Sequence, residues 1–236
     1  MLCKISDLIV EIPATGDMPQ RCREYITEDK GNGADIIIRA DLYKYDSWPT
    51  LSEDGVIYME SGFQFYFQLL MFDGIMLHAS AVEYEGKAYL FSGPSGRGKS
   101  THTRLWQKIY GDKVQVFNDD KPALRRIDGK WYAYGTPWAG KHGINRNIKV
   151  PLGGICFIKR GQENKISRMD KTKAVQNIIG QSTSKTSDVN KINNLLNSVD
   201  KLIREIPIFE LECLPDEAAA ILSSTTMCRA AQEENL

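Results

Sequence analysis

The spacing of apolar residues along the chain predicts helices at intervals through the sequence. Between residues 61 and 72, for example, Phe63, Tyr66, Phe67 and Leu70 recur three and four positions apart, so they fall on one face of a helix. The same spacing, together with capping residues at the start of the last helices, predicts helices at residues 61–72, 99–110, 170–180 and 188–204 and from residue 215 onward.

Shorter apolar runs bounded by turn residues predict strands. They occupy residues 35–40, 55–59, 75–82, 87–92, 113–117, 123–127, 130–134, 154–159, 165–168 and 206–214. Short connections around Gly86, Gly129 and Gly161 predict three hairpins. Regular alternation of strand and helix would indicate a parallel sheet, but here hairpins precede and follow the central helix. We therefore predict an α/β fold of α+β character, with a mixed, largely antiparallel sheet and flanking helices.

The pattern predicts one domain in two parts. A length of 236 residues suits a single large domain. Residues 1–60 form a strand-rich N-terminal extension in this interpretation, and residues 62–222 form the core.

Composition and charge limit the classes of partner that we expect for this protein. Hydrophobic residues make up 42% of the chain, enough for a substantial core, and 30 basic side chains balance 30 acidic ones. This balance argues against a nucleic-acid partner, which would require a basic excess. The most apolar run, residues 63–71, is too short to span a bilayer, and the first residues lack a signal-peptide pattern. None of the five cysteines forms a Cys-x-x-Cys pair, which argues against structural zinc. We expect a cytoplasmic protein that contacts no membrane.

Residues 93–100 carry the clearest motif, glycine, four residues and then Gly-Lys-Ser. A strand is predicted before this segment and a helix after it, which is the context of a phosphate-binding loop. Glycines allow backbone N–H groups to converge on phosphate, Lys99 adds positive charge, and the Ser100 hydroxyl can ligate Mg²⁺. The alternative is a glycine-rich turn without a ligand. The motif predicts ATP and Mg²⁺ binding by Gly93, Ser95, Gly96, Arg97, Gly98, Lys99, Ser100 and Thr101.

Two adjacent carboxylates, Asp119 and Asp120, follow the strand predicted at residues 113–117. Acidic residues after an apolar strand, downstream of a phosphate loop, are typical of a Mg²⁺-binding position. One carboxylate can hold the metal while the other accepts the proton of an attacking hydroxyl. The alternative is that the pair only opens a turn before Pro122.

The segment from His78 to Asp120 resembles the kinase domain of HPr kinase/phosphorylase, and more distantly the ATP-dependent phosphoenolpyruvate carboxykinase fold. The resemblance rests on residues 77–80, the phosphate loop and residues 118–120, which occur in the family's order and spacing. Residues 135–138, with Gly140 and Lys141, resemble a subgroup of short HPr-kinase-related proteins often encoded beside peptide-modification genes. The likeness extends over about residues 62–222.

This resemblance implies roles for individual residues. It implies that Asp119 is the base and that Asp120 lies nearer the metal, although the sequence leaves their order open. It also implies that His78 faces the phosphates, where it could bind one or orient an aspartate. The alternative for His78 is a hydrogen-bonded histidine of the core.

The loop at residues 135–146 is the predicted wall of the acceptor site. Trp138 could be an apolar anchor, and Lys141 and Arg146 could bind phosphate or an acidic peptide. The alternatives are a core tryptophan and a solvated basic loop.

Together these features predict an ATP-dependent kinase that phosphorylates a hydroxyl, such as serine of a peptide or small protein. A nucleotide-binding accessory or regulatory protein and a carboxykinase-like enzyme acting on a small metabolite are the alternatives. The sequence leaves open the acceptor, phosphoryl donors other than ATP, a phosphorylase reaction and the formation of a homo-oligomer.

Overall fold

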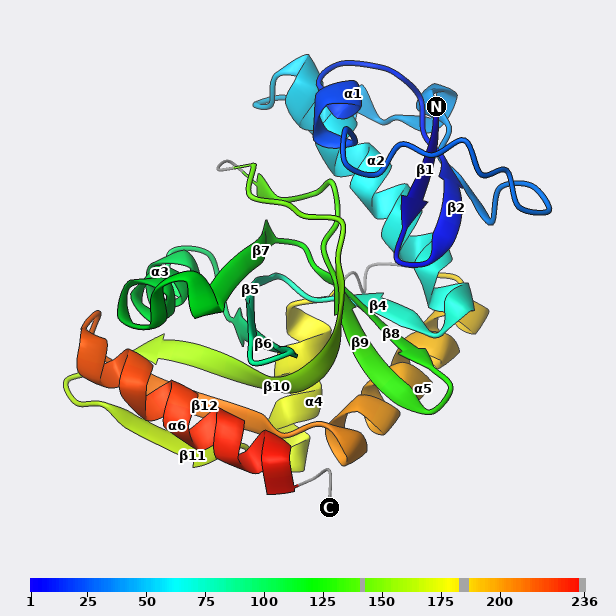
Figure 1. Ribbon diagram of the computed structural model, residues 1–236. Coiled ribbons are helices and arrows are strands. Elements are labelled where there is room, and N and C mark those ends of the chain that lie inside the picture. The colour runs from blue at the N-terminus through cyan, green and yellow to red at the C-terminus, as the bar shows by residue number, and fades with distance from the viewer. Residues whose placement is uncertain (141–142, 183–186, 234–236) are drawn as a thin grey trace.

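The main sheet is curled and mixed. The computed structural model describes residues 1–140, 143–182 and 187–233, and nine strands of this part form the sheet in the order β4-β8-β9-β10-β6-β5-β7, with β12 beside β10 and β11 beside β12 (Figure 1). The strands are β4 Gly74–Met76, β5 Ala79–Tyr84, β6 Lys87–Ser92, β7 Val114–Asp120, β8 Ala123–Ile127, β9 Lys130–Tyr134, β10 Lys149–Arg160, β11 Lys165–Arg168 and β12 Ile208–Cys213. β10 runs parallel to β6 and β12, and the other pairs are antiparallel. The predicted fold class is confirmed.

Helices cover both faces of this sheet. α3 Lys99–Tyr110 and α6 Glu217–Glu233 pack on one face, and α4 Lys171–Gly180 and α5 Val189–Glu205 pack on the other (Figure 1). Side chains of β6 alternate between the two cores, as the period of two in a strand requires. Leu90 lies in the core beneath α4 and α5, whereas Phe91 lies in the core beneath α3 and α6.

The N-terminal part builds a third core. β1 Leu2–Ile5, β2 Leu8–Glu11 and β3 Ile36–Ile37 form a small sheet, with the short helix α1 Met18–Arg21 and the long helix α2 Glu53–Leu69 beside it. Short 3₁₀ turns occupy Ala40–Leu42, Tyr45–Ser47, Leu70–Phe72 and Gly111–Lys113. None of the described helices is long and apolar enough to cross a bilayer.

Three sequence predictions about secondary structure are wrong. The strand predicted at residues 55–59 is the beginning of α2, where Ser52 caps the helix by accepting a hydrogen bond from the Gly55 N–H at 3.2 Å. Val56 and Ile57 are buried on this helix, so packing outweighs the strand preference of β-branched residues. Helix α2 therefore continues across the boundary predicted near residue 60.

The strand predicted at residues 75–82 is divided, because β4 ends at Met76 and β5 begins at Ala79. The hairpin predicted from residues 154–168 does not form either. β12 lies between β10 and β11, parallel to the first and antiparallel to the second. That pairing joins segments about 50 residues apart, which local patterns cannot reveal.

Candidate active site

The sheet topology brings three chemically important segments to one edge. β5 lies between β6 and β7 and runs antiparallel to both, so Ala79 at its start is opposite Ser92 on β6 and Asp120 on β7. His78 immediately precedes β5, and the phosphate loop immediately follows β6. These segments therefore lie close together because of the antiparallel register.

The phosphate loop has the backbone geometry of an anion site. Gly98 precedes α3 with φ of +101°, and no side chain caps this helix end. Gly93 has φ of +143°, and a Cβ there would lie 3.1 Å from the Ile158 carbonyl oxygen. Only glycine suits that position. The uncapped N–H groups at the start of α3 favour a bound anion.

Lys99 folds back onto the loop that precedes it. Its Nζ donates to the carbonyl oxygens of Gly93 at 2.9 Å and Pro94 at 3.3 Å, and the residue is 8% exposed. Burial lowers the pKa of Lys99, and the nearby Asp120 and Asp119 carboxylates oppose that shift. Within the described residues Lys99 has no ion pair, so its charge lies in the loop without a direct carboxylate partner.

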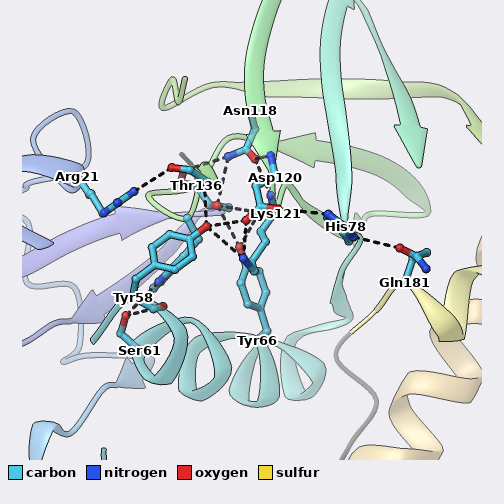
Figure 2. A network of polar contacts seen from close by, with 12 residues as sticks. Arg21, Tyr58, Ser61, Tyr66, His78, Asn118, Asp120, Lys121, Thr136 and Gln181 are labelled. Atoms are coloured by element: carbon cyan, nitrogen blue, oxygen red, sulfur yellow. Dashed lines mark hydrogen bonds and ion pairs between the residues drawn. The ribbon is translucent and has the colours of Figure 1, made fainter. Parts of the chain in front are cut away.

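Asp120 is held by three neighbouring side chains (Figure 2). Its Oδ2 accepts hydrogen bonds from the Tyr58 hydroxyl at 2.7 Å and from Lys121 Nζ, and its Oδ1 lies 3.4 Å from His78 Nε2. Burial alone would raise the pKa of Asp120, but Lys121, Tyr58 and His78 outweigh it, so this pKa lies below its usual value. Asp120 is therefore a stable anion.

Asp119 differs from its neighbour. Its side chain lines the same cavity as Lys99 and Ser100, yet among the described residues its carboxylate has no hydrogen bond or ion pair. Of the two carboxylates, Asp119 is thus the one free to contact a ligand. The assignment of one as base and the other as metal ligand stays a prediction.

The turn after β7 is built by Asn118, for which the sequence predicted no role of its own. Asn118 is fully buried, and its Oδ1 accepts from the N–H groups of Lys121 at 2.9 Å and Asp120 at 3.3 Å. Its Nδ2 donates to the Thr136 carbonyl at 3.0 Å (Figure 2). Because Asn118 shapes the turn, neither aspartate carboxylate is needed for it.

His78 bridges the sheet edge and the end of α4. Its backbone N–H donates to the Gln181 carbonyl at 2.7 Å, and its Nδ1 lies 3.1 Å from Gln181 Oε1. Burial and the Lys99 charge lower the pKa of His78, while Asp120 opposes the shift. The imidazole thus lies between a polar partner and a carboxylate, at the edge of the cavity.

A cavity of about 730 Å³ joins these groups. On one side it is lined by His78, Ser95, Gly96, Gly98, Lys99, Ser100, Thr101, Asp119, Asp120, Lys121, Gly140 and Arg160. Of the predicted loop residues, Gly93 is buried beneath it and Arg97 lines a separate hollow.

The other side of the cavity comes from the N-terminal part, which the sequence analysis did not connect with the site. Its residues there are Asp17, Arg21, Ser52, Asp54, Gly55, Tyr58 and Met59. No motif marks them, because they approach the phosphate loop only through the packing of α1 and α2.

The predicted acceptor wall is partly wrong. Trp138 is fully buried, stacks on Phe65 with ring centroids 4.8 Å apart and donates to Ser61 Oγ at 3.1 Å, so it belongs to the core and cannot anchor a ligand. Arg146 is exposed and lies outside the cavity lining, with its N–H bonded to the Phe117 carbonyl at 2.9 Å. Lys141 lies outside the described residues.

Comparison with known proteins finds a matching family and similar solved structures. Residues 50–214 match the family described as SynChlorMet cassette protein ScmC. A structure of the Hpr(Ser) kinase/phosphatase from Coxiella burnetii is similar over 68% of this chain and 92% of that chain, with a TM-score of 0.39 and 10% sequence identity. No curated protein matched the sequence.

Proposed function

The chain belongs to the ScmC family of SynChlorMet cassette proteins, and we propose that it is an ATP-dependent kinase that phosphorylates a hydroxyl, most simply a serine of a peptide or small protein. The observation that carries the proposal is the convergence of Lys99, Ser100 and Asp119 on one cavity of about 730 Å³. A phosphate loop alone would be sufficient for nucleotide binding. A free carboxylate beside it adds the group that transfer to a hydroxyl requires.

Phosphoryl transfer depends mainly on positioning and on charge stabilisation. The acceptor oxygen forms a bond to the γ-phosphorus while the bond from that phosphorus to the β,γ-bridging oxygen breaks. The hydroxyl proton passes to the Asp119 carboxylate, and ADP leaves. Lys99, released from its loop carbonyls, would offset negative charge on the phosphates, and Asp120 would keep His78 and Lys121 in place.

The residues present fit a magnesium ion. Ser100 supplies a hydroxyl at the end of the phosphate loop, and Asp120 supplies a carboxylate oxygen, both ligands that Mg²⁺ prefers. The described residues contain no cluster of three His, Cys, Asp or Glu side chains suited to a metal, so phosphate oxygens would complete the coordination. When bound, the ion would offset charge on the phosphates.

The test measures phosphoryl transfer and nucleotide binding separately in the same variant. Asp119→Asn keeps the shape of the side chain but removes the base, so Mg²⁺–ATP should bind as before while transfer falls by about 10²-fold or more. Binding is measured by calorimetry, and transfer by mass spectrometry after incubation with ATP and a library of serine-containing peptides. Asp112→Asn, at an exposed position after α3, is the matched control.

Each alternative has its own outcome. Unchanged transfer in both Asp119→Asn and Asp120→Asn would contradict the catalytic role proposed for the carboxylate pair. Tight ATP binding by the wild type without transfer to any acceptor would favour a nucleotide-binding accessory protein. Transfer to small metabolites alone would favour a carboxykinase-like enzyme.

A further inference from the structure

A second cavity of about 370 Å³ adjoins the first. The two share Asp17, Arg21 and Gly140 in their linings. The second cavity lies between α1 and the segment after β9, and its remaining lining residues are Gln20, Arg23, Glu24, Gly143 and Asn145. This set is polar and contains both signs of charge.

The boundary between the two cavities lies against the carboxylate pair. Gly140 has φ of +64°, and a Cβ there would lie 3.0 Å from Asp120 Cβ and 3.2 Å from the Asp119 carbonyl oxygen. Its N–H donates to the Tyr58 hydroxyl at 2.9 Å. A chain that crosses from the second cavity to the first therefore passes beside the residues proposed to act on the hydroxyl.

Arg21 is fixed at this boundary. Its guanidinium lies 4.6 Å from the centre of the Tyr58 ring, pairs with Asp17 at 2.7 Å and reaches the Gly140 carbonyl at 3.5 Å. Asn145 Nδ2 donates to the Arg21 carbonyl at 3.1 Å, which ties the opposite wall to α1. Both walls of the second cavity are thus joined by hydrogen bonds within the protein.

Resting on the proposed kinase function, we infer that the second cavity binds the residues flanking the acceptor hydroxyl of an extended peptide. The phosphoryl donor occupies the first cavity at the phosphate loop, and the hydroxyl lies at the boundary beside Gly140. A free amino acid or other small metabolite would leave the second cavity unused. The substrate class is therefore a peptide.

The charges of the cavity select among peptides. Asp17 is paired with Arg21, and Glu24 Oε2 accepts from the Asn147 N–H at 3.3 Å. Arg23 is exposed, and among the described residues its guanidinium has no hydrogen bond or ion pair. Glu24 keeps its negative charge, so the lining is not positive overall, but its carboxylate already accepts from a backbone donor. The Arg23 guanidinium is the charged group left free to pair, so the site favours an acidic side chain near the acceptor serine.

The experiment compares peptides with free L-serine as acceptors of phosphate from Mg²⁺–ATP. The peptides are a positional library of 15 residues with one central serine. We expect the wild type to phosphorylate peptides at least about 100-fold more efficiently than L-serine, with an acidic residue preferred at one flanking position. Arg23→Glu should raise KM for those acidic peptides by about 5- to 10-fold and shift the preference to lysine, because the ion pair becomes a repulsion. ATP affinity and kcat should stay the same.

Arg229→Glu is the matched control, because Arg229 is also an exposed arginine but lies on α6 and lines neither cavity. It should leave the library preference unchanged. Equal use of L-serine and peptides, or an unchanged preference in Arg23→Glu, would overturn the inference while leaving a kinase that depends on Asp119. Loss of transfer to every acceptor with ATP binding intact would overturn the proposed function and the inference with it.

Discussion

The hydroxyl of Tyr58 connects the N-terminal part of the chain to the candidate active site. It donates to Asp120 Oδ2 at 2.7 Å and accepts from the Gly140 N–H at 2.9 Å and from Lys121 Nζ at 3.1 Å (Figure 2). We predict that Tyr58→Phe, which removes only this oxygen, disturbs the protonation and position of Asp120 while leaving the phosphate loop intact.

The size of the expected change in the pKa of Asp120 follows from the kind of hydrogen bond that is lost. A hydrogen bond to a charged group contributes about 1.5–3 kcal/mol. It favours ionised Asp120, and 1.36 kcal/mol corresponds to one pKa unit. Lys121 and His78 still stabilise the anion in the variant, so the pKa of Asp120 should rise by about one unit, the lower part of that range. The pKa of Asp120 rises rather than falls, because the variant loses a hydrogen-bond donor to the ionised carboxylate.

The assay is the pH titration of the Asp120 carboxylate followed by NMR, together with calorimetry of ATP binding. The midpoint of the Asp120 titration should move up by about one pH unit, and ATP affinity should not change. Tyr66→Phe is the matched control, because Tyr66 lies on the same helix but its hydroxyl contacts the Lys121 carbonyl and Thr136 rather than a carboxylate. It should lower stability without moving the Asp120 titration.

Two results would refute this reasoning. An Asp120 titration midpoint at the wild-type value in Tyr58→Phe would mean that the pKa of Asp120 does not depend on Tyr58. Equal shifts in Tyr58→Phe and Tyr66→Phe would mean that any loss of packing around α2 produces the effect.

Three further predictions concern other residues. Lys99→Ala removes the charge at the phosphate loop, so calorimetry should show a fall of at least about tenfold in Mg²⁺–ATP affinity, or about 1.4 kcal/mol, and unchanged binding and turnover would contradict the loop assignment. Trp138→Ala should lower the free energy of unfolding by about 3–5 kcal/mol, the usual range for a buried aromatic, and denaturant unfolding would measure it. Burial lowers the pKa of His102 to about 4 from 6.5. The unfolded state therefore gains the proton first as pH falls, and stability should drop by about 2 kcal/mol between pH 7 and pH 5, a loss that His102→Gln would lack.

The glycine-rich loop at residues 93–100, with the strand before it and the helix after it, was predictable because its signals are local. Glycines at fixed spacing specify a backbone that only they adopt, and the apolar spacing before and after them predicts the strand β6 and the helix α3. The hairpin of β5 and β6 followed from its turn residues, since Glu85 and Gly86 both have positive φ. The fold class followed from the number of such hairpins.

The acceptor side could not be predicted in the same way. Trp138 and Arg146 lie in a glycine-containing loop that suggests a binding surface, but tertiary packing places one in the core and the other away from the cavity. Sequence spacing gives the face of an element on which a residue lies. It does not give the element that packs against that face.

The sequence by itself determined the glycine-rich loop between β6 and α3, the position of the acidic pair at the end of β7 and a sheet rich in hairpins, because each depends on contacts between residues near in the chain. Only the tertiary structure decided that Tyr58 and Arg21 face that loop, that β12 separates β10 from β11 and that Asn118 forms the turn at the Asp pair. Those arrangements join segments up to about 120 residues apart. They are selected by the burial of whole helix and sheet faces, a property of the assembled core rather than of any short segment.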